Sequence, residues 1–320
     1  MPFDPAALVA AQQPVVLRGL VRDWPLVQAG LAGPASAAAY LKRFYAGAPV
    51  VGFTAPADAG GRFFYDDAMT GMNFTAARVA LDGWLDRLLS APEEALYVGS
   101  TDLDTYLPGL RGENPLPGGF GAATPLAGIW IGNRTIAATH WDQSNNVACC
   151  VAGRRRFTLF PPDQIGNLYP GPLEPTPGGQ VVSMVDFRDP DRARYPRFTQ
   201  AEAAGQVAEL EPGDMLFYPA LWWHHVEALD DFNLLINYWW NTSPAFIDTP
   251  QNTLLHAMLS LRDRPEAEKA AWKAMFDYYI FGPADLPVVH LPVAAQGALG
   301  PLDEMKARRL RATLLNKLNR

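Results

Sequence analysis

The chain has 320 residues, of which 49% are hydrophobic and 18% charged, and its formal net charge at pH 7 is -7. This composition provides enough apolar surface for a sizeable core and excludes wholesale disorder. The acidic balance argues against a nucleic-acid partner, because phosphate binding needs a concentrated basic surface. The one basic run, 154–156, is too short to supply it.

The sequence gives no sign of a membrane or secreted protein. No stretch reaches the ~18–20 uninterrupted apolar residues that a membrane span needs, and the N-terminal residues lack the pattern of a secretory signal. A disulfide between the adjacent Cys149 and Cys150 would be strained, so we expect both thiols to be reduced. We therefore expect a cytoplasmic protein with no membrane partner.

Residues 1–128 are predicted to form a mixed α/β flank that packs on the core of the protein. Short apolar runs predict three strands, over 14–18, 50–53 and 62–65. Apolar residues at helical spacing predict two helices, over 35–45 and 76–89. The buried stripe of the second helix is expected to consist of Ala80, Trp84, Leu88 and Leu89.

Residues 129–245 consist of apolar segments separated by turn signals such as Ala152-Gly153. They predict successive strands over 129–131, 139–142, 146–151, 155–160, 207–210, 215–218, 224–228 and 234–239. A long irregular insert, 161–199, interrupts the series, and inserts of this length are usually lids, binding loops or ordered excursions. The pattern indicates a mainly β core with flanking helices.

Residues 246–320 are predicted to form a helical appendage. Helices are expected over 252–262, 266–281 and 302–318, with Pro265 well placed to begin the second. Their faces are strongly apolar, so the appendage either caps the core or pairs with a second subunit. We expect a homodimer formed through these helices.

The sequence His140-Trp141-Asp142 is the clearest sign of a functional site. Side chains alternate along a strand, so His140 and Asp142 lie on the same face. One further imidazole from a distant strand would complete a set of two histidines and one carboxylate. Such a set leaves coordination positions open and is typical of non-haem iron(II) oxygenases.

Four other histidines are candidates for the third ligand. His256 lies in a predicted helix and His290 in a proline-rich tail, so both are less suitable. His224 and His225 are neighbours on a predicted strand and point to opposite faces, so at most one of them binds the metal. The alternative is that these histidines are hydrogen-bonded core residues beside ordinary aromatic packing. The presence of both motifs on strands of one series favours the metal site.

Several motifs follow one another in a fixed order along the chain. They are His-Trp-Asp at 140–142, Gly-Arg-Arg-Arg-Phe-Thr-Leu-Phe-Pro-Pro at 153–162, Leu-Tyr-Pro at 168–170, Pro-Gly-Asp at 212–214, Trp-Trp-His-His-Val at 222–226 and Asn-Tyr-Trp at 237–239. Together they resemble the cupin-like JmjC oxygenases, the group that contains the asparaginyl hydroxylase inhibiting hypoxia-inducible factor. The resemblance covers about 14–240. It implies a double-stranded β-helix (jelly-roll or cupin) core in which His224 completes an iron(II) site and His225 turns away.

The same resemblance implies 2-oxoglutarate as a cosubstrate, whose far carboxylate needs a fixed cation. Where the family has a lysine this chain has Arg155, which strand alternation directs away from the side of Arg154 and Arg156. A guanidinium can bind a carboxylate through two hydrogen bonds. Three further residues match positions that line the cosubstrate pocket, namely Asn146, Asn237 and Tyr97. Ala137 replaces a threonine that the family pattern places there.

The resemblance favours an iron(II)- and 2-oxoglutarate-dependent dioxygenase that hydroxylates a C–H bond, most often of a protein side chain. Demethylation would begin with the same hydroxylation, and a small-molecule substrate is also open. The candidates for substrate contact are Trp239, Gln143 and Trp222. Arg155 and Ala137 leave open a cupin metalloenzyme that does not use 2-oxoglutarate. A non-catalytic, metal-stabilised binding protein is the third possibility, which the intact triad disfavours.

Overall fold

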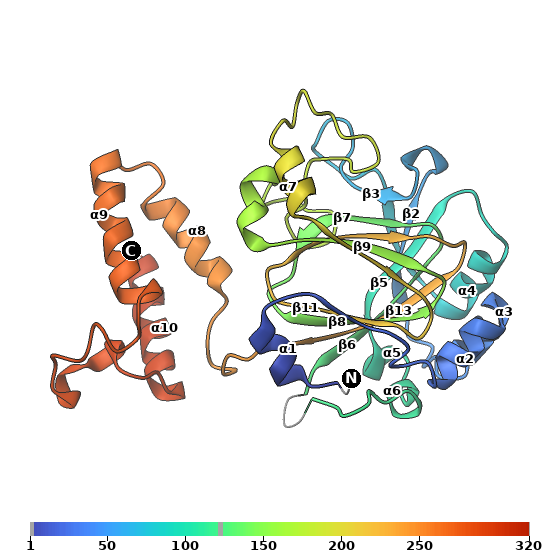
Figure 1. Cartoon of the computed structure of the whole chain (residues 1–320), viewed down its shortest axis with the longest axis horizontal. Coiled ribbons are helices and arrows are strands. Elements are labelled where there is room, and N and C mark those ends of the chain that lie inside the picture. The colour runs from blue at the N-terminus through green and yellow to red at the C-terminus, as the bar shows by residue number, and fades with distance from the viewer. Residues whose placement is uncertain (1–2, 121–123, 320) are drawn as a thin grey trace. The chain divides into compact units, whose positions relative to one another are not determined.

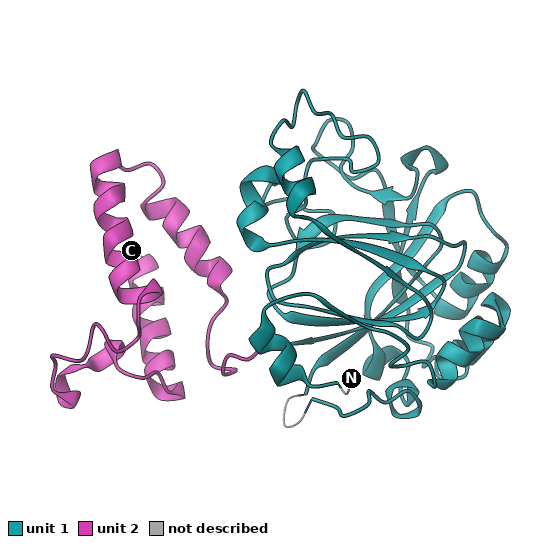
Figure 2. Cartoon of the chain, viewed as in Figure 1, with its two compact units in different colours: residues 1–240 teal, residues 241–320 magenta. Residues whose placement is uncertain are grey.

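A computed structural model describes residues 3–120 and 124–319, and the chain divides into two compact units, residues 1–240 and 241–320 (Figure 2). Among the described residues, no helix combines the length and the apolar character that crossing a bilayer requires. Cys149 and Cys150 are both free and buried, as expected for reduced thiols.

Two facing β-sheets form the core of the first unit (Figure 1). Their strands are β1 (Val15–Leu17), β2 (Val50–Ala55), β3 (Arg62–Phe63), β4 (Thr75–Val79), β5 (Ala95–Asp102), β6 (Leu126–Gly132), β7 (Ile136–Trp141), β8 (Asn145–Ala152), β9 (Arg155–Phe160), β10 (Gln206–Leu210), β11 (Met215–Tyr218), β12 (Trp223–Ala228) and β13 (Asn233–Trp240). The larger sheet has the order β1-β11-β8-β13-β6-β5-β2-β4, and the smaller has β10-β9-β12-β7-β3. Neighbouring strands run antiparallel, apart from the parallel pair β3 and β7. The mainly β, cupin-like fold predicted from the sequence is confirmed.

Each of the eight strands predicted after residue 128 coincides with an observed strand. Alternating apolar residues specify them well, because one face of each sheet packs against the other sheet. Ala148, Leu216 and Leu235 from the larger sheet meet Phe157 and Leu159 from the smaller one in a buried cluster. This shared core fixes the register of the strands that carry the candidate metal ligands.

The residues before 129 contribute directly to this core. Strands β1, β2, β4 and β5 extend the larger sheet, so residues 1–240 form one compact unit with no division near residue 128. The helices of this region are α1 (Pro5–Ala11), α2 (Pro25–Ala32), α3 (Pro34–Lys42), α4 (Leu81–Leu89), α5 (Leu103–Tyr106) and α6 (Leu110–Glu113). Side chains from α2, α3 and α4 pack in one large hydrophobic cluster with the larger sheet.

The helix predicted over 76–89 is wrong in its first part. Residues 75–79 form the edge strand β4, whose backbone pairs with β2, and the helix begins only at Leu81. Pairing along the sheet edge has overridden the local helical spacing, as tertiary context often does. The buried face consequently consists of Leu81, Trp84, Leu85 and Leu88, while Leu89 is exposed.

The insert over 161–199 is an ordered excursion beside the smaller sheet. It begins with a short 3-10 helix at Pro162–Asn167 and ends in α7 (Phe198–Ala204). Between these elements, the Ser183 N–H donates to the Thr139 carbonyl oxygen at 2.7 Å, and Val182 bridges to His140. The insert therefore lies against the strand that carries the first metal-ligand motif.

The second unit contains the three predicted C-terminal helices, α8 (Pro250–Ser260), α9 (Glu266–Phe276) and α10 (Glu304–Leu318). The second predicted helix, over 266–281, is observed as α9 followed by a π-helical turn at Asp277–Phe281. None of these three helices buries a side chain, judged over the residues that the structure describes.

Candidate metal centre and its cavity

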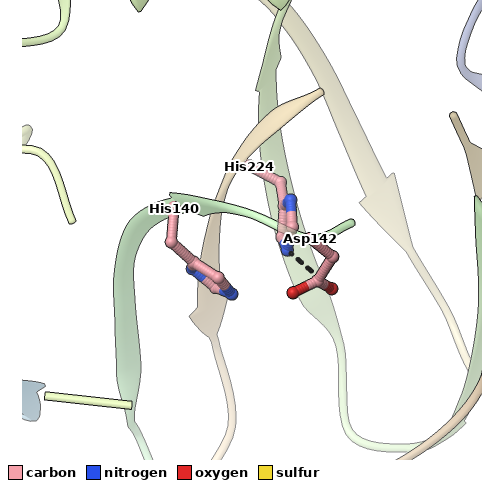
Figure 3. A group of neighbouring side chains, drawn as sticks. All are labelled: His140, Asp142 and His224. Atoms are coloured by element: carbon pink, nitrogen blue, oxygen red, sulfur yellow. Dashed lines mark ion pairs between the residues drawn. The ribbon is translucent and has the colours of Figure 1, made fainter. Parts of the chain in front are cut away.

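Three side chains converge at one end of the smaller sheet (Figure 3). Strands β7 and β12 pair with His140 directly opposite His224, and Asp142 follows the last residue of β7. The two imidazole centroids are 4.2 Å apart, and Nε2 of His224 lies 3.7 Å from Oδ2 of Asp142. The three candidate ligand atoms all lie within 4.8 Å of one another, close enough for one metal ion to be shared among them. The predicted grouping of these residues is confirmed.

The backbone holds both imidazoles in the tautomer that a metal requires. Nδ1 of His140 donates to the Ala138 carbonyl oxygen at 2.8 Å, and Nδ1 of His224 donates to the Trp222 carbonyl oxygen at 3.0 Å. A carbonyl oxygen only accepts, so each Nδ1 carries the proton and each Nε2 keeps its lone pair. Such hydrogen bonds behind a ligand fix the orientation of its ring.

Neighbouring side chains keep the Asp142 carboxyl ionised. Its Oδ2 accepts hydrogen bonds from Nδ2 of Asn146 at 2.9 Å and from Nε1 of Trp239 at 3.3 Å. Burial alone would raise the pKa of Asp142, but the adjacent His224 and His140, together with these two donors, lower it. The carboxylate is therefore available as a ligand at neutral pH.

Strand alternation separates the two adjacent histidines as expected. Burial, reinforced by the nearby His140, lowers the pKa of His224 to about 4, so its imidazole is neutral and able to bind a metal at pH 7. The His225 ring points to the other face of the sheet. There it stacks on Phe187 with centroids 4.6 Å apart, and its Nδ1 lies 3.3 Å from Oγ1 of Thr139.

The three consecutive arginines have different surroundings. Arg154 pairs with Asp230 at 2.8 Å and Arg156 pairs with Glu209 at 2.7 Å, both at the surface. Arg155 is only 3% exposed, and its Nε and Nη2 have no hydrogen-bond partner among the described residues. Burial lowers the pKa of Arg155 from its usual high range, and the guanidinium stays charged at neutral pH. An unpartnered cation in this position fits an anionic ligand.

A cavity of about 560 Å³ joins the triad to this buried guanidinium. Of the predicted cosubstrate residues, Arg155, Tyr97 and Asn237 line it. Asn146 is not among the described lining residues, but it hydrogen-bonds to two that are. Its Oδ1 accepts from Nδ2 of Asn237 at 2.6 Å, and its own Nδ2 donates to Oδ2 of Asp142. A cavity of this size is typical of small-molecule sites.

The predicted substrate contacts are only partly placed at the cavity. Trp239 lines it, whereas Gln143 and Trp222 are not among the described residues of its wall. The Trp222 side chain packs in the core cluster that contains Leu216 and Tyr218. Trp222 contributes to the site through its carbonyl oxygen, which accepts the hydrogen bond from Nδ1 of His224. Trp222 precedes β12 in a turn, so the alternation that governs His224 does not extend to it.

Sequence reasoning missed most of the cavity wall. Phe53, Phe63, Phe74 and Trp130 line it, together with Val182 of the insert. They come from separate strands and loops that no single motif connects. The position of the missing threonine, Ala137, also lies in the cavity wall, and so does Thr135 two residues earlier.

A cupin-like β core with an inward-facing His-Asp-His triad is the arrangement of JmjC-type metal-dependent oxygenases. Comparison with known families agrees, since the model of the cupin-like domain matches residues 2–246, and the chain belongs to this family.

Several curated proteins share part of this sequence. The chain is 26% identical over 238 residues to lysine-specific demethylase 8 of Xenopus tropicalis, covering 72% of this chain and 48% of that protein. It is 36% identical over 113 residues to human HSPB1-associated protein 1, covering 35% and 22%. It is 35% identical over 107 residues to tRNA wybutosine-synthesizing protein 5 of Danio rerio, covering 33% and 30%. The chain thus spans at most about half the length of these relatives.

Proposed function

We propose that this protein is an iron(II)- and 2-oxoglutarate-dependent dioxygenase that hydroxylates a C–H bond. The observation that carries the proposal is the presence, in one cavity, of an open His-Asp-His triad and a buried guanidinium with unpartnered N–H groups. A keto acid with a second carboxylate matches both features, because one end can chelate a metal and the other can accept hydrogen bonds from Arg155.

Each part of the site then has a defined task. The residues assigned to iron(II) are His140, Asp142 and His224, and those assigned to 2-oxoglutarate are Arg155, Tyr97 and Asn237, with Asn146 supporting them. When bound, iron(II) and 2-oxoglutarate would supply the oxygen chemistry: dioxygen is the oxidant, one of its atoms enters the C–H bond, and the other enters the succinate that forms with carbon dioxide from 2-oxoglutarate. The chain contributes fixed imidazole orientations, an ionised carboxylate and aromatic side chains in the cavity lining that keep water from the reacting groups.

A protein side chain is the substrate that we favour. The relatives named above include a lysine-specific demethylase and a tRNA wybutosine-synthesizing protein, so their names point to different substrates. The net charge of -7 disfavours a nucleic acid, which would require a basic surface around the cavity.

The competing function is that of a cupin metalloenzyme that does not use 2-oxoglutarate. Ala137, which lies in the cavity wall where the family pattern has a threonine, is the observation in its favour. The two functions differ in what Arg155 does, because only the first requires an anionic ligand at that guanidinium.

Anaerobic titration of the protein with iron(II) and then 2-oxoglutarate tests the proposal. We expect the weak visible absorption band of the metal-bound keto acid, followed by slow succinate formation when air is admitted. Asp142→Ala should show neither, whereas Asp163→Ala, which changes a carboxylate in the 3-10 helix at Pro162–Asn167, should behave like the unchanged protein. Iron binding without the band and without succinate would favour the competing function.

We also propose that the second unit pairs two copies of this chain. Its helices expose large apolar side chains, including Leu259 at 81%, Phe281 at 76% and Met305 at 69%. Exposed apolar surface of this kind usually marks an interface, and identical copies most often pair through the same surface on each. The molar mass of the protein in solution, measured by light scattering, tests this.

A further inference from the structure

Aromatic rings dominate the cavity wall, and of these only Tyr97 is assigned to the cosubstrate. Phe53 contacts Phe74 with ring centroids 5.6 Å apart, and Phe74 contacts Phe63 at 5.3 Å. Phe63 contacts Tyr97 at 5.5 Å, and Tyr97 stacks on Trp130 at 5.8 Å. Together with Trp239, which meets Trp130 edge to face at 6.0 Å, the rings form an unbroken series along the cavity. We call this series the aromatic wall.

Charged groups are scarce in the same cavity. Among the described lining residues, the only histidine, carboxylate, lysine or arginine side chains are His140, Asp142, His224 and Arg155. The proposed function engages all four, three with the metal and one with the cosubstrate. No carboxylate and no cation of the described lining is then left to pair with a charge on the substrate.

The cavity is large enough for a second group beside the cosubstrate. 2-Oxoglutarate has ten heavy atoms, which occupy about 300 Å³ if each takes as much space as a water molecule in the liquid, ~30 Å³. Out of about 560 Å³, roughly 250 Å³ then remains. This space suits one large side chain.

We infer that the residue presented to the metal is an uncharged, apolar side chain of a peptide, either aliphatic or aromatic. The inference rests on the proposed function and narrows its substrate. Apolar burial against the aromatic wall is favourable in proportion to the area removed from water. Trp130 adds a buried Nε1–H with no partner among the described residues, which suits a neutral oxygen such as a peptide carbonyl.

An N-methylated lysine is the main competitor, because aromatic rings also attract cations. That attraction is smaller than the cost of removing an ammonium group from water unless a carboxylate accompanies it. Asp142, the only described carboxylate in the lining, is committed to the metal, and the far carboxylate of the cosubstrate is paired with Arg155, so neither is free to accompany an ammonium group. The cavity therefore disfavours a methylammonium group.

Peptide libraries with one fixed central residue test the inference on the full-length, iron-loaded protein. Four libraries with randomised flanks would carry leucine, phenylalanine, asparagine or trimethyl-lysine at the centre. We expect mass gains of one oxygen in the leucine or phenylalanine library at least tenfold above the asparagine library, and no formaldehyde from trimethyl-lysine. Formaldehyde release, a preference for asparagine, or reaction of no library by an enzyme that still forms succinate would overturn the inference. Loss of both succinate and the keto-acid band would instead defeat the underlying proposed function.

A matched pair of variants tests the role of the aromatic wall. Phe74 is half-buried where the chain enters β4, so Phe74→Leu keeps the wall apolar and Phe74→Glu places a carboxylate in it. Hydroxylated apolar peptide is measured relative to succinate formed without peptide, which corrects for the fraction of active enzyme. This ratio should be at least tenfold lower in Phe74→Glu than in Phe74→Leu. Equal ratios would show that the wall does not select the substrate.

Discussion

Replacing Arg155 with methionine gives the sharpest test of the cosubstrate assignment. Nε and Nη2 of Arg155 are the two donors without a partner, and a hydrogen bond to a charged group contributes about 1.5–3 kcal/mol. Loss of both should weaken 2-oxoglutarate binding by about 3 kcal/mol or more, which is roughly a 100-fold or greater rise in Kd. Anaerobic titration monitored by the absorption band of the keto acid measures this change.

The same substitution should leave the ligand-free protein at least as stable as before. A buried cation without a partner carries an uncompensated desolvation cost, and an apolar side chain of similar length removes that cost. Thermal unfolding without 2-oxoglutarate should therefore show an equal or higher Tm. Arg154→Met, which changes the neighbouring exposed arginine, is the control and should leave the Kd unchanged. A lower Tm combined with an unchanged Kd would show that Arg155 is structural, and the reasoning would fail.

Three further outcomes are expected. Trp239→Phe removes the N–H that donates to Asp142 and should weaken iron(II) binding ~10–100-fold. Competition with a chromophoric chelator measures this affinity, and an unaltered affinity would show that the hydrogen bond from Trp239 does not hold the carboxylate in place. Burial raises the pKa of the Cys150 thiol to about 12 and raises that of Cys149 well above its usual range, so neither should react with Ellman's reagent at pH 8 until the protein unfolds. Prompt reaction of the folded protein would refute this. Leu259→Asp should halve the molar mass in solution if the second unit forms the dimer. The control Val207→Asp, which changes an exposed residue of the edge strand β10, should leave the molar mass unchanged. A monomeric parent protein would refute the pairing.

The sequence predicted the strands of the core more reliably than the walls of the site. Period-two alternation places His224 and His225 on opposite faces of their strand, and the family resemblance then selects His224 as the inward residue, as the structure shows. The same rule separates Arg155 from Arg154 and Arg156, and the structure shows that Arg155 is the buried one. These separations depend only on positions within one strand.

Features that depend on contacts between distant segments could not be predicted in this way. Residues 75–79 have helical spacing but pair with β2, because an available sheet edge satisfies their backbone groups. Phe53, Phe74 and Trp130 come together only when β2, β4 and β6 take their places in the larger sheet. Trp222 has the same parity as His224, but it lies in a turn, where parity does not determine direction.

The metal and cosubstrate parts of the cavity share one chain of hydrogen bonds, and its polarity is set by Asp142. An ionised carboxylate only accepts, so Asn146 must direct its Nδ2 toward Asp142 and its Oδ1 toward Asn237. Asn237 must then donate its Nδ2 to Asn146, which leaves its Oδ1 as a buried acceptor without a partner among the described residues. The charge of a metal ligand thus determines that the unpartnered atom of Asn237 is an acceptor, which can receive a hydrogen bond from a donor but not from a carboxylate. A substitution at Asp142 will therefore alter the hydrogen bonding of Asn237 in the cosubstrate part of the cavity, through Asn146 and without direct contact.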